Sequence, residues 1–103
     1  MITTLDKELE NISGKEYGGF SSREFSNLIK SSLQGKVTSE FKVPERGDGR
    51  TGRIDILYEI GGERYGIEID RISARRKSIV KLYSIDLDYR VVITRSPVKI
   101  IYI

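Results

Sequence analysis

Three carboxylates gather on two segments that are expected to pair. Asp55 lies in the alternating apolar segment 54–60, and Glu68 and Asp70 lie in the segment 63–70, which follows a Gly-Gly dipeptide. A two-residue glycine loop between alternating segments indicates a β-hairpin. If the two glycines form the loop, Asp55 stands directly opposite Glu68. Carboxylates at opposed positions, with Cβ atoms roughly 4.5–5.5 Å apart, repel one another unless water, a proton or a cation separates them.

The composition excludes several other kinds of chemical site. The chain has no cysteine and no histidine, so it cannot hold thiolate zinc sites, cysteine nucleophiles or Ser-His-Asp triads. A hydrolase of this composition would depend on carboxylates, lysine and a hard metal such as Mg²⁺ or Mn²⁺. The alternative interpretation is a solvated strand face with one unfavourable acid pair. The third carboxylate, Asp70, and the central place of the hairpin favour the cation site.

The elements that must position these carboxylates follow from periodicity and chain breakers. The sequence predicts helices over 4–12, 22–33 and 74–85, and strands over 37–43, 54–60, 63–70, 89–94 and 98–103. Ser21 and Glu24 have the spacing of a capping box before the second helix, and Gly35 is suited to ending it. Ser73 can cap the third helix, whose inward residues are expected to be Ile72, Ile79, Val80 and Tyr83.

The order of these elements predicts an α/β fold. A helix between the strands 63–70 and 89–94 implies a parallel, right-handed pairing. We therefore expect a three-layer arrangement, with a mixed five-stranded sheet flanked by helices. The chain is expected to form one domain, 1–103, with an N-terminal helix and linker over 1–20 and the core over 21–103. The core face of the hairpin is expected to carry Ile54, Ile56, Tyr58, Ile60, Tyr65, Ile67 and Ile69.

Charge and hydropathy indicate a class of partner. The net charge is +3, and the excess of basic residues lies in 41–103, which favours a polyanionic partner, most simply nucleic acid. The sequence has neither a signal-peptide pattern nor an apolar run of membrane-spanning length, so we expect an intracellular, cytoplasmic protein without a membrane partner. A homodimer would allow two subunits of this size to span a duplex.

The carboxylate pattern within this order of elements resembles the PD-(D/E)XK nuclease-like superfamily. Ile54-Asp55 corresponds to the Pro-Asp position of the family, and Glu68-Ile69-Asp70 corresponds to its (D/E)XK triplet, with Asp70 in place of lysine. The resemblance covers roughly 21–103. It implies a restriction-endonuclease-like sheet in the order 1-2-3-4-5 with the second strand antiparallel. It also implies hydrolysis of phosphodiester bonds, with Asp55 and Glu68 holding Mg²⁺. As a nuclease, the protein would be expected to act on DNA.

The lysine of the family triplet is missing. Asp70 cannot neutralise phosphate charge, so it is expected to be an auxiliary metal ligand or a partner of Arg53. Some members of the superfamily place the lysine on the following helix, where this chain has Lys77 and Lys81. Lys77 lies closer in sequence to the third strand, and we therefore expect it to be the charge-stabilising cation.

Further residues are candidates for supporting roles. Glu24 and Glu40 are possible auxiliary acids, although capping explains Glu24 equally well and the strand phase at Glu40 is open. The residues expected to hold the phosphate backbone are Arg50, Arg53, Arg71, Arg75, Arg76 and Lys81. Cations at a helix start oppose the helix dipole, which a nearby phosphate would explain, the alternative being a solvated basic surface. The alternative function is a nuclease-fold protein that has lost catalysis and binds nucleic acid or a protein partner.

Overall fold

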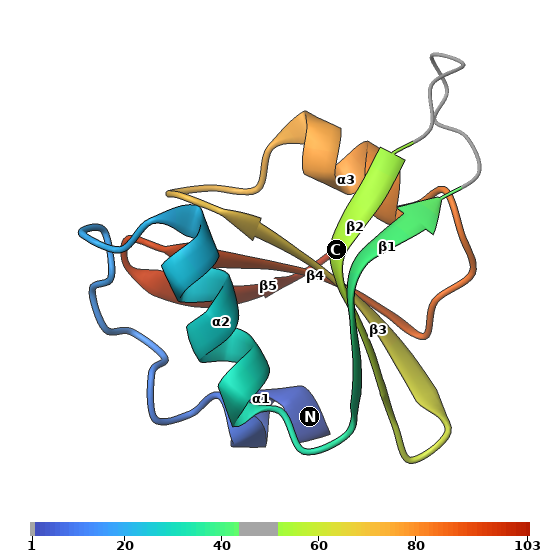
Figure 1. Ribbon diagram of the computed structural model, residues 1–103, viewed down its shortest axis with the longest axis horizontal. Helices are drawn as coiled ribbons and strands as arrows, with labels where there is room; N and C mark the ends of the chain where they lie inside the picture. Colours follow the sequence, from blue (N-terminus) through green and yellow to red (C-terminus); the bar gives the residue numbers. More distant parts are fainter. Residues whose placement is uncertain (1, 44–51) are drawn as a thin grey trace.

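The computed structural model of the chain describes residues 2–43 and 52–103. The candidate Arg50 lies outside these residues. The elements, in chain order, are α1 (Thr4–Glu8), α2 (Ser22–Ser32), β1 (Lys36–Val43), β2 (Gly52–Ile60), β3 (Glu63–Asp70), α3 (Arg76–Leu82), β4 (Tyr89–Arg95) and β5 (Val98–Tyr102) (Figure 1). The predicted order of helices and strands is confirmed.

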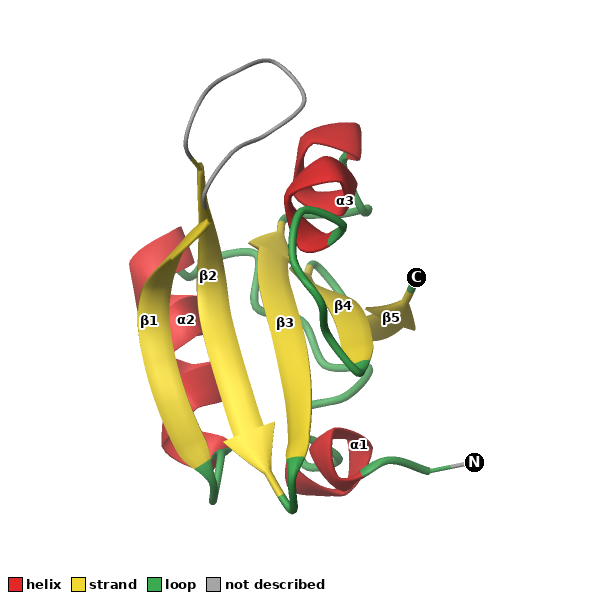
Figure 2. Cartoon of the chain, turned by 90° about the vertical axis from the view of Figure 1, so that its right-hand side faces the viewer, coloured by secondary structure: helices red, strands yellow, loops and turns green. Residues whose placement is uncertain are grey.

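The strands form a mixed sheet in the order β1-β2-β3-β4-β5. β3 and β4 are parallel, and the other neighbouring strands are antiparallel. α3 connects the parallel pair, as predicted. Helices lie on both faces: α2 is seen behind β1 in Figure 2, and α3 packs on the opposite face through the buried Leu82. The α/β class and the five-stranded mixed sheet are therefore confirmed.

The main core lies between the sheet and the first two helices. Ile56, Tyr58 and Ile67 of the hairpin pack there with Phe25 and Ile29 of α2. The N-terminal segment contributes to this same core through its buried residues Leu5, Leu9 and Ile12. Residues preceding α2 therefore help to hold the sheet rather than acting only as a linker.

Gly35 has a different role from the predicted one. α2 ends at Ser32, and Gly35 is not among the glycines with positive φ, so it does not end the helix through a left-handed conformation. Gly35 instead allows the backbone to pass close to β2: a Cβ added at this position would lie 2.5 Å from the carbonyl oxygen of Glu59 and 2.8 Å from the Cβ of Ile60. The Gly35 N–H also donates to the hydroxyl of Tyr58 at 3.0 Å.

Gly35→Ala is expected to destabilise the protein by about 1–3 kcal/mol, because the overlap involves backbone that cannot move aside without disturbing β2. Gly19→Ala is the matched control, since nothing lies within 4 Å of a Cβ added there. Urea unfolding of both variants gives the free energies of unfolding. Equal midpoints for the two variants would contradict the close-packing role of Gly35.

The predicted orientation of the third helix is wrong. α3 begins at Arg76 rather than after Ser73, and three residues expected to face inward are exposed, namely Ile72 (65%), Val80 (42%) and Tyr83 (57%). Its buried residues are Ser78 and Leu82. Polar contacts with two carboxylates of β3, described below, set the phase of the helix and override its apolar pattern.

The predicted core face of the hairpin is also wrong at one position. Ile56 packs on the α2 side of the sheet, whereas Ile54 belongs to a second apolar cluster on the α3 side. β1 makes the same change, because Val37 packs on the α2 side and Val43 packs on the α3 side. The two strands therefore exchange faces together.

The exchange of faces is centred on Glu40. This residue has φ 54°, in the left-handed region that non-glycine residues rarely adopt. The register of the β1–β2 pairing is the same before and after Glu40, since Ser39 lies opposite Ile56 and Phe41 lies opposite Ile54. Glu40 and the facing residue Asp55 therefore lie where the strand pair turns over.

Candidate functional site

The Asp55 and Glu68 carboxylates lie opposite one another, as the hairpin register predicts. The recorded pairing of β2 with β3 runs from Ile60 opposite Glu63 to Ile56 opposite Ile67. Beyond it, each carboxylate accepts a backbone N–H from the other strand: Asp55 N donates to Glu68 Oε2 at 2.8 Å, and Ile69 N donates to Asp55 Oδ2 at 2.8 Å. The two carboxylates thus bridge the strands just beyond the end of the backbone pairing, and these hydrogen bonds fix their positions.

Lys81 is the cation that reaches these carboxylates. Its Nζ lies 2.6 Å from Glu68 Oε1, and only 16% of its side chain is exposed. Lys77, the lysine favoured from the sequence, is exposed and does not line the pocket around the acids. Lys81 lies on the same side of α3 as the buried Ser78 and Leu82, because residues three or four apart share a helix face. The structure therefore brings together Asp55, Glu68 and Lys81.

Asp70 is directed towards the start of α3. Its side chain is fully buried and accepts hydrogen bonds from the Arg75 N–H at 2.9 Å, from Arg75 Nε at 2.8 Å and from the Ser78 hydroxyl at 3.0 Å. It does not line the pocket. Asp70 is therefore neither the auxiliary ligand in the pocket nor the partner of Arg53 that the sequence led us to expect. It fixes the first turn of α3 instead.

Arg90, from β4, holds the other end of α3. Its Nε donates to the carbonyl of Leu82 at 3.0 Å, and its Nη2 donates to that of Ile85 at 3.1 Å. Its guanidinium also lies 4.5 Å from the ring centroid of Tyr83. An isolated helix of seven residues is unstable, so these contacts at both ends determine where Lys81 lies. Sequence reasoning missed Arg90, although a cation near a helix C-terminus is a known stabilising pattern.

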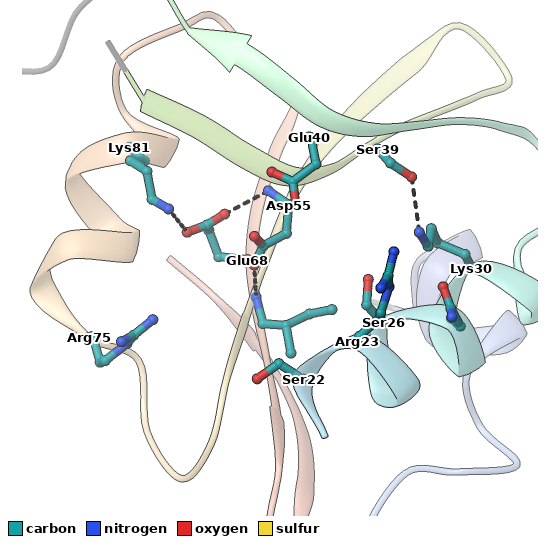
Figure 3. Close-up of a pocket in the computed structure, with 12 residues that line it drawn as sticks. Ser22, Arg23, Ser26, Lys30, Ser39, Glu40, Asp55, Glu68, Arg75 and Lys81 are labelled. Atoms are coloured by element: carbon teal, nitrogen blue, oxygen red, sulfur yellow. Dashed lines mark hydrogen bonds and ion pairs between the residues drawn. The ribbon is translucent and has the colours of Figure 1, made fainter. Parts of the chain in front are cut away.

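A pocket of about 750 Å³ opens over the carboxylate pair, between α2 and α3 (Figure 3). It has acids, cations and hydroxyls in its wall. The acids are Glu40, Asp55 and Glu68, the cations are Arg23, Lys30, Arg75 and Lys81, and the hydroxyl groups belong to Ser22, Ser26 and Ser39. Such a wall suits a charged, polar ligand rather than an apolar one.

The two auxiliary acids are separated by the structure. Glu40 lines the pocket beside Asp55. Glu24 does not; it forms the predicted capping box, in which Ser21 N donates to Glu24 Oε1 at 2.9 Å and Glu24 N donates to Ser21 Oγ at 3.1 Å. The hydrogen bond from the Ser21 N–H lowers the pKa of Glu24.

The predicted phosphate-binding residues are only partly gathered at the pocket. Of the described candidates, Lys81 and Arg75 line it, and Arg75 is also engaged with Asp70. Arg53, Arg71 and Arg76 are exposed and lie outside the lining. Sequence reasoning missed Arg23 and Lys30 on α2. A helical projection of α2 gives the signal, because these residues share one polar face opposite Phe25 and Ile29.

Burial raises the pKa of both central carboxyls. For Glu68, loss of solvent is the largest cause and the nearby Asp55 charge adds to it, while the Lys81 ammonium and the Asp55 N–H oppose it. For Asp55, burial again raises the pKa most, the Ile69 N–H and Lys81 lower it, and the charges of Glu40 and Asp70 raise it. Loss of solvent is thus the main reason why the ionised forms of both carboxyls are disfavoured, and a cation bound beside them would favour the ionised forms.

Without divalent metal, the raised pKa values predict a pH-dependent stability. The folded state holds protons at Asp55 and Glu68 that the unfolded state has released, so the free energy of unfolding falls as pH rises above the ordinary values of 3.8 and 4.5 towards the raised ones. Asp55→Asn removes one of these groups while keeping an oxygen that can accept from Ile69 N–H. Urea unfolding in chelator from about pH 4 to pH 7 should show a smaller decline for Asp55→Asn than for the wild type. Parallel curves would contradict the raised pKa of Asp55.

The central residues fit Mg²⁺ as a two-carboxylate site. Mg²⁺ prefers carboxylate oxygens, keeps several waters, and is commonly held by one or two carboxylates together with substrate phosphates. Asp55 and Glu68 supply such oxygens on adjacent strands. Within 2–43 and 52–103, no group of three or more acidic, histidine or cysteine residues is arranged to hold a metal ion, so a metal here would complete its coordination with water and ligand oxygens.

Comparison of the chain with models of protein families, with characterised proteins and with solved structures gave no match. None of the helices in the described part of the chain is long and apolar enough to cross a membrane.

Proposed function

We propose that this protein is a metal-dependent nuclease of the PD-(D/E)XK type, with a restriction-endonuclease-like fold, and that it hydrolyses phosphodiester bonds in DNA. The observation that carries the proposal is the Asp55–Glu68 pair, fixed by reciprocal backbone hydrogen bonds and joined by Lys81 in a polar pocket. Carboxylates and a lysine at one site are the groups needed for metal-assisted cleavage of a phosphodiester.

Asp55 and Glu68 would hold Mg²⁺ or Mn²⁺, and Glu40, beside Asp55, is placed to support them. The bound metal would supply Lewis acidity towards the scissile phosphate. The Lys81 ammonium would stabilise the negative charge that develops on the phosphate oxygens. Arg75 and Lys81 would attract the phosphate backbone into the pocket.

Lys81 can interact with the site both before and after a metal ion binds. In the structure it offsets the charge of Glu68 at 2.6 Å. Neutralisation of Glu68 by a bound cation would weaken this ion pair and leave the ammonium available to a phosphate oxygen. A lysine on α3 therefore takes the place of the lysine that the family triplet lacks at Asp70.

The test is cleavage of supercoiled and branched DNA with Mg²⁺ or Mn²⁺ and with chelator. We expect metal-dependent nicking by the wild type, and loss of it in Asp55→Asn and Glu68→Gln. Glu10→Gln is the matched control and should cleave normally, because Glu10 is an exposed acid that does not line the pocket. No cleavage by the wild type with either metal, or full cleavage by Asp55→Asn, would overturn the proposal.

The second candidate function is a nuclease-fold protein that binds nucleic acid without cutting it. Asp70 favours this candidate, because the residue at the lysine position of the family triplet is an acid that holds the start of α3 and carries no positive charge to the site. DNA binding that is unaffected by Mg²⁺ or Mn²⁺, without any cleavage, would support this candidate.

A further inference from the structure

One face of α2 forms the pocket wall opposite α3. The helix buries Phe25 and Ile29 in the core, and its other face presents Arg23, Ser26 and Lys30 to the pocket (Figure 3). These three positions follow one another at intervals of three and four residues, so they form one continuous stripe along the helix. We call them the α2 stripe.

Within residues 2–43 and 52–103, the cations of the α2 stripe form no ion pair with the acids that line the pocket. The ion pairs recorded among the described residues join Arg75 to Asp70 and Lys81 to Glu68. Lys30 instead donates to the hydroxyl of Ser39 at 3.0 Å. Within the described residues, Arg23 and Lys30 thus keep their charge available to a ligand in the pocket, whereas Arg75 and Lys81 each pair with a carboxylate.

The polar groups of the stripe suit phosphate. A guanidinium presents several donors in a planar fork that matches phosphate oxygens, and lysine and serine are common partners of the nucleic-acid backbone. A ligand in this pocket must also approach the Asp55–Glu68 pair. A phosphodiester strand can do so when a cation lies on the carboxylates, because Mg²⁺ sites commonly share phosphate oxygens with the substrate.

We infer that the α2 stripe binds the sugar–phosphate backbone of one nucleic-acid strand, on the side of the pocket opposite Lys81. The inference takes its ligand class from the proposed function, but it concerns binding and does not require cleavage. It divides the pocket into a wall on α2 that holds the strand and a wall on α3 that bears the reacting cation.

The experiment measures binding of the full chain to a short fluorescent single-stranded oligonucleotide with a cleavage-resistant backbone, at a fixed Mg²⁺ concentration and, for comparison, in chelator, over a series of salt concentrations. For a single strand, each lost phosphate contact should lower the magnitude of the slope of log K against log salt by about 0.7. Arg23→Gln and Lys30→Gln are each expected to weaken binding and reduce the slope by about that amount, and the double variant by about 1.4. Lys7→Gln and Lys99→Gln, at exposed lysines outside the pocket, are the matched controls.

The outcomes separate this inference from the proposed function. The inference would be overturned if the double variant had the same affinity and the same slope of log K against log salt as the control variants, even if the wild type cleaves DNA. Reduced slopes without any cleavage would support the inference and leave the second candidate function. Preferential displacement of the oligonucleotide by polyglutamate over polyphosphate would overturn it in favour of an acidic polypeptide. Thermal melting of each variant checks that the fold is retained.

Discussion

Lys81→Met is expected to lower metal-dependent cleavage by about 10²- to 10³-fold, the effect typical of removing one group that stabilises transition-state charge. The reason is its position: Nζ of Lys81 lies 2.6 Å from Glu68 in a pocket wall where only 16% of the lysine side chain is exposed. Cleavage rates at saturating metal and DNA measure the effect, because binding differences then have little influence.

Lys77→Met is the matched control for this prediction. Lys77 is the other lysine of α3, but it is exposed and lies outside the pocket, so its removal should leave the rate unchanged. Lys81→Arg should recover part of the activity, because it keeps the charge at nearly the same reach. A large loss in Lys77→Met with normal rates in Lys81→Met would show that the assignment of the cation is reversed.

The second large effect is on stability. Asp70→Lys, the substitution that restores the family triplet, is expected to destabilise the protein by about 3 kcal/mol or more. The Asp70 side chain is fully buried and accepts three hydrogen bonds from Arg75 and Ser78. Lysine there would place a buried cation beside Arg75 and remove the acceptors that fix the start of α3. Chemical denaturation at neutral pH gives the difference in free energy of unfolding.

Two further variants define what the loss means. Asp70→Asn keeps an acceptor for the Arg75 N–H and should lose only about 1–2 kcal/mol. Asp86→Lys makes the same charge change at an exposed position and should stay within about 0.5 kcal/mol of the wild type. If Asp70→Lys instead folds stably and cleaves faster, then Asp70 does not anchor α3 and the site merely lacks its triplet lysine.

The hairpin was predictable because its information is local. Gly61 and Gly62 adopt φ 59° and 80°, the left-handed values that a two-residue hairpin turn requires and glycine supplies without strain. The turn fixes the register, and the register places Asp55 opposite Glu68. The exchange of faces at Glu40 was not predictable, because a left-handed glutamate leaves no signal in an alternating pattern. Ile54 was therefore assigned to the wrong side of the sheet.

The phase of α3 was not predictable from its apolar pattern. Ile72, Val80 and Tyr83 indicated one inward face, yet Ser78 and Lys81 face inward because buried carboxylates of β3 require partners. For the same reason, proximity in sequence selected Lys77 when the geometry selects Lys81. The polar contacts that hold α3 come from residues on the neighbouring strands, such as Asp70 and Arg90, and the pattern of a single helix does not report them.

The carboxylates and the ammonium of the site are held by different parts of the fold. Asp55 and Glu68 are held by the backbone of two paired strands, whereas the ammonium of Lys81 is carried by a short helix fastened at Asp70 and Arg90. Substitutions at those two fastening points can relocate the ammonium without disturbing the register of the acids. In a metal-dependent nuclease of the proposed kind, metal affinity and turnover would therefore be separable traits, and one could be tuned or lost during divergence while the other persists.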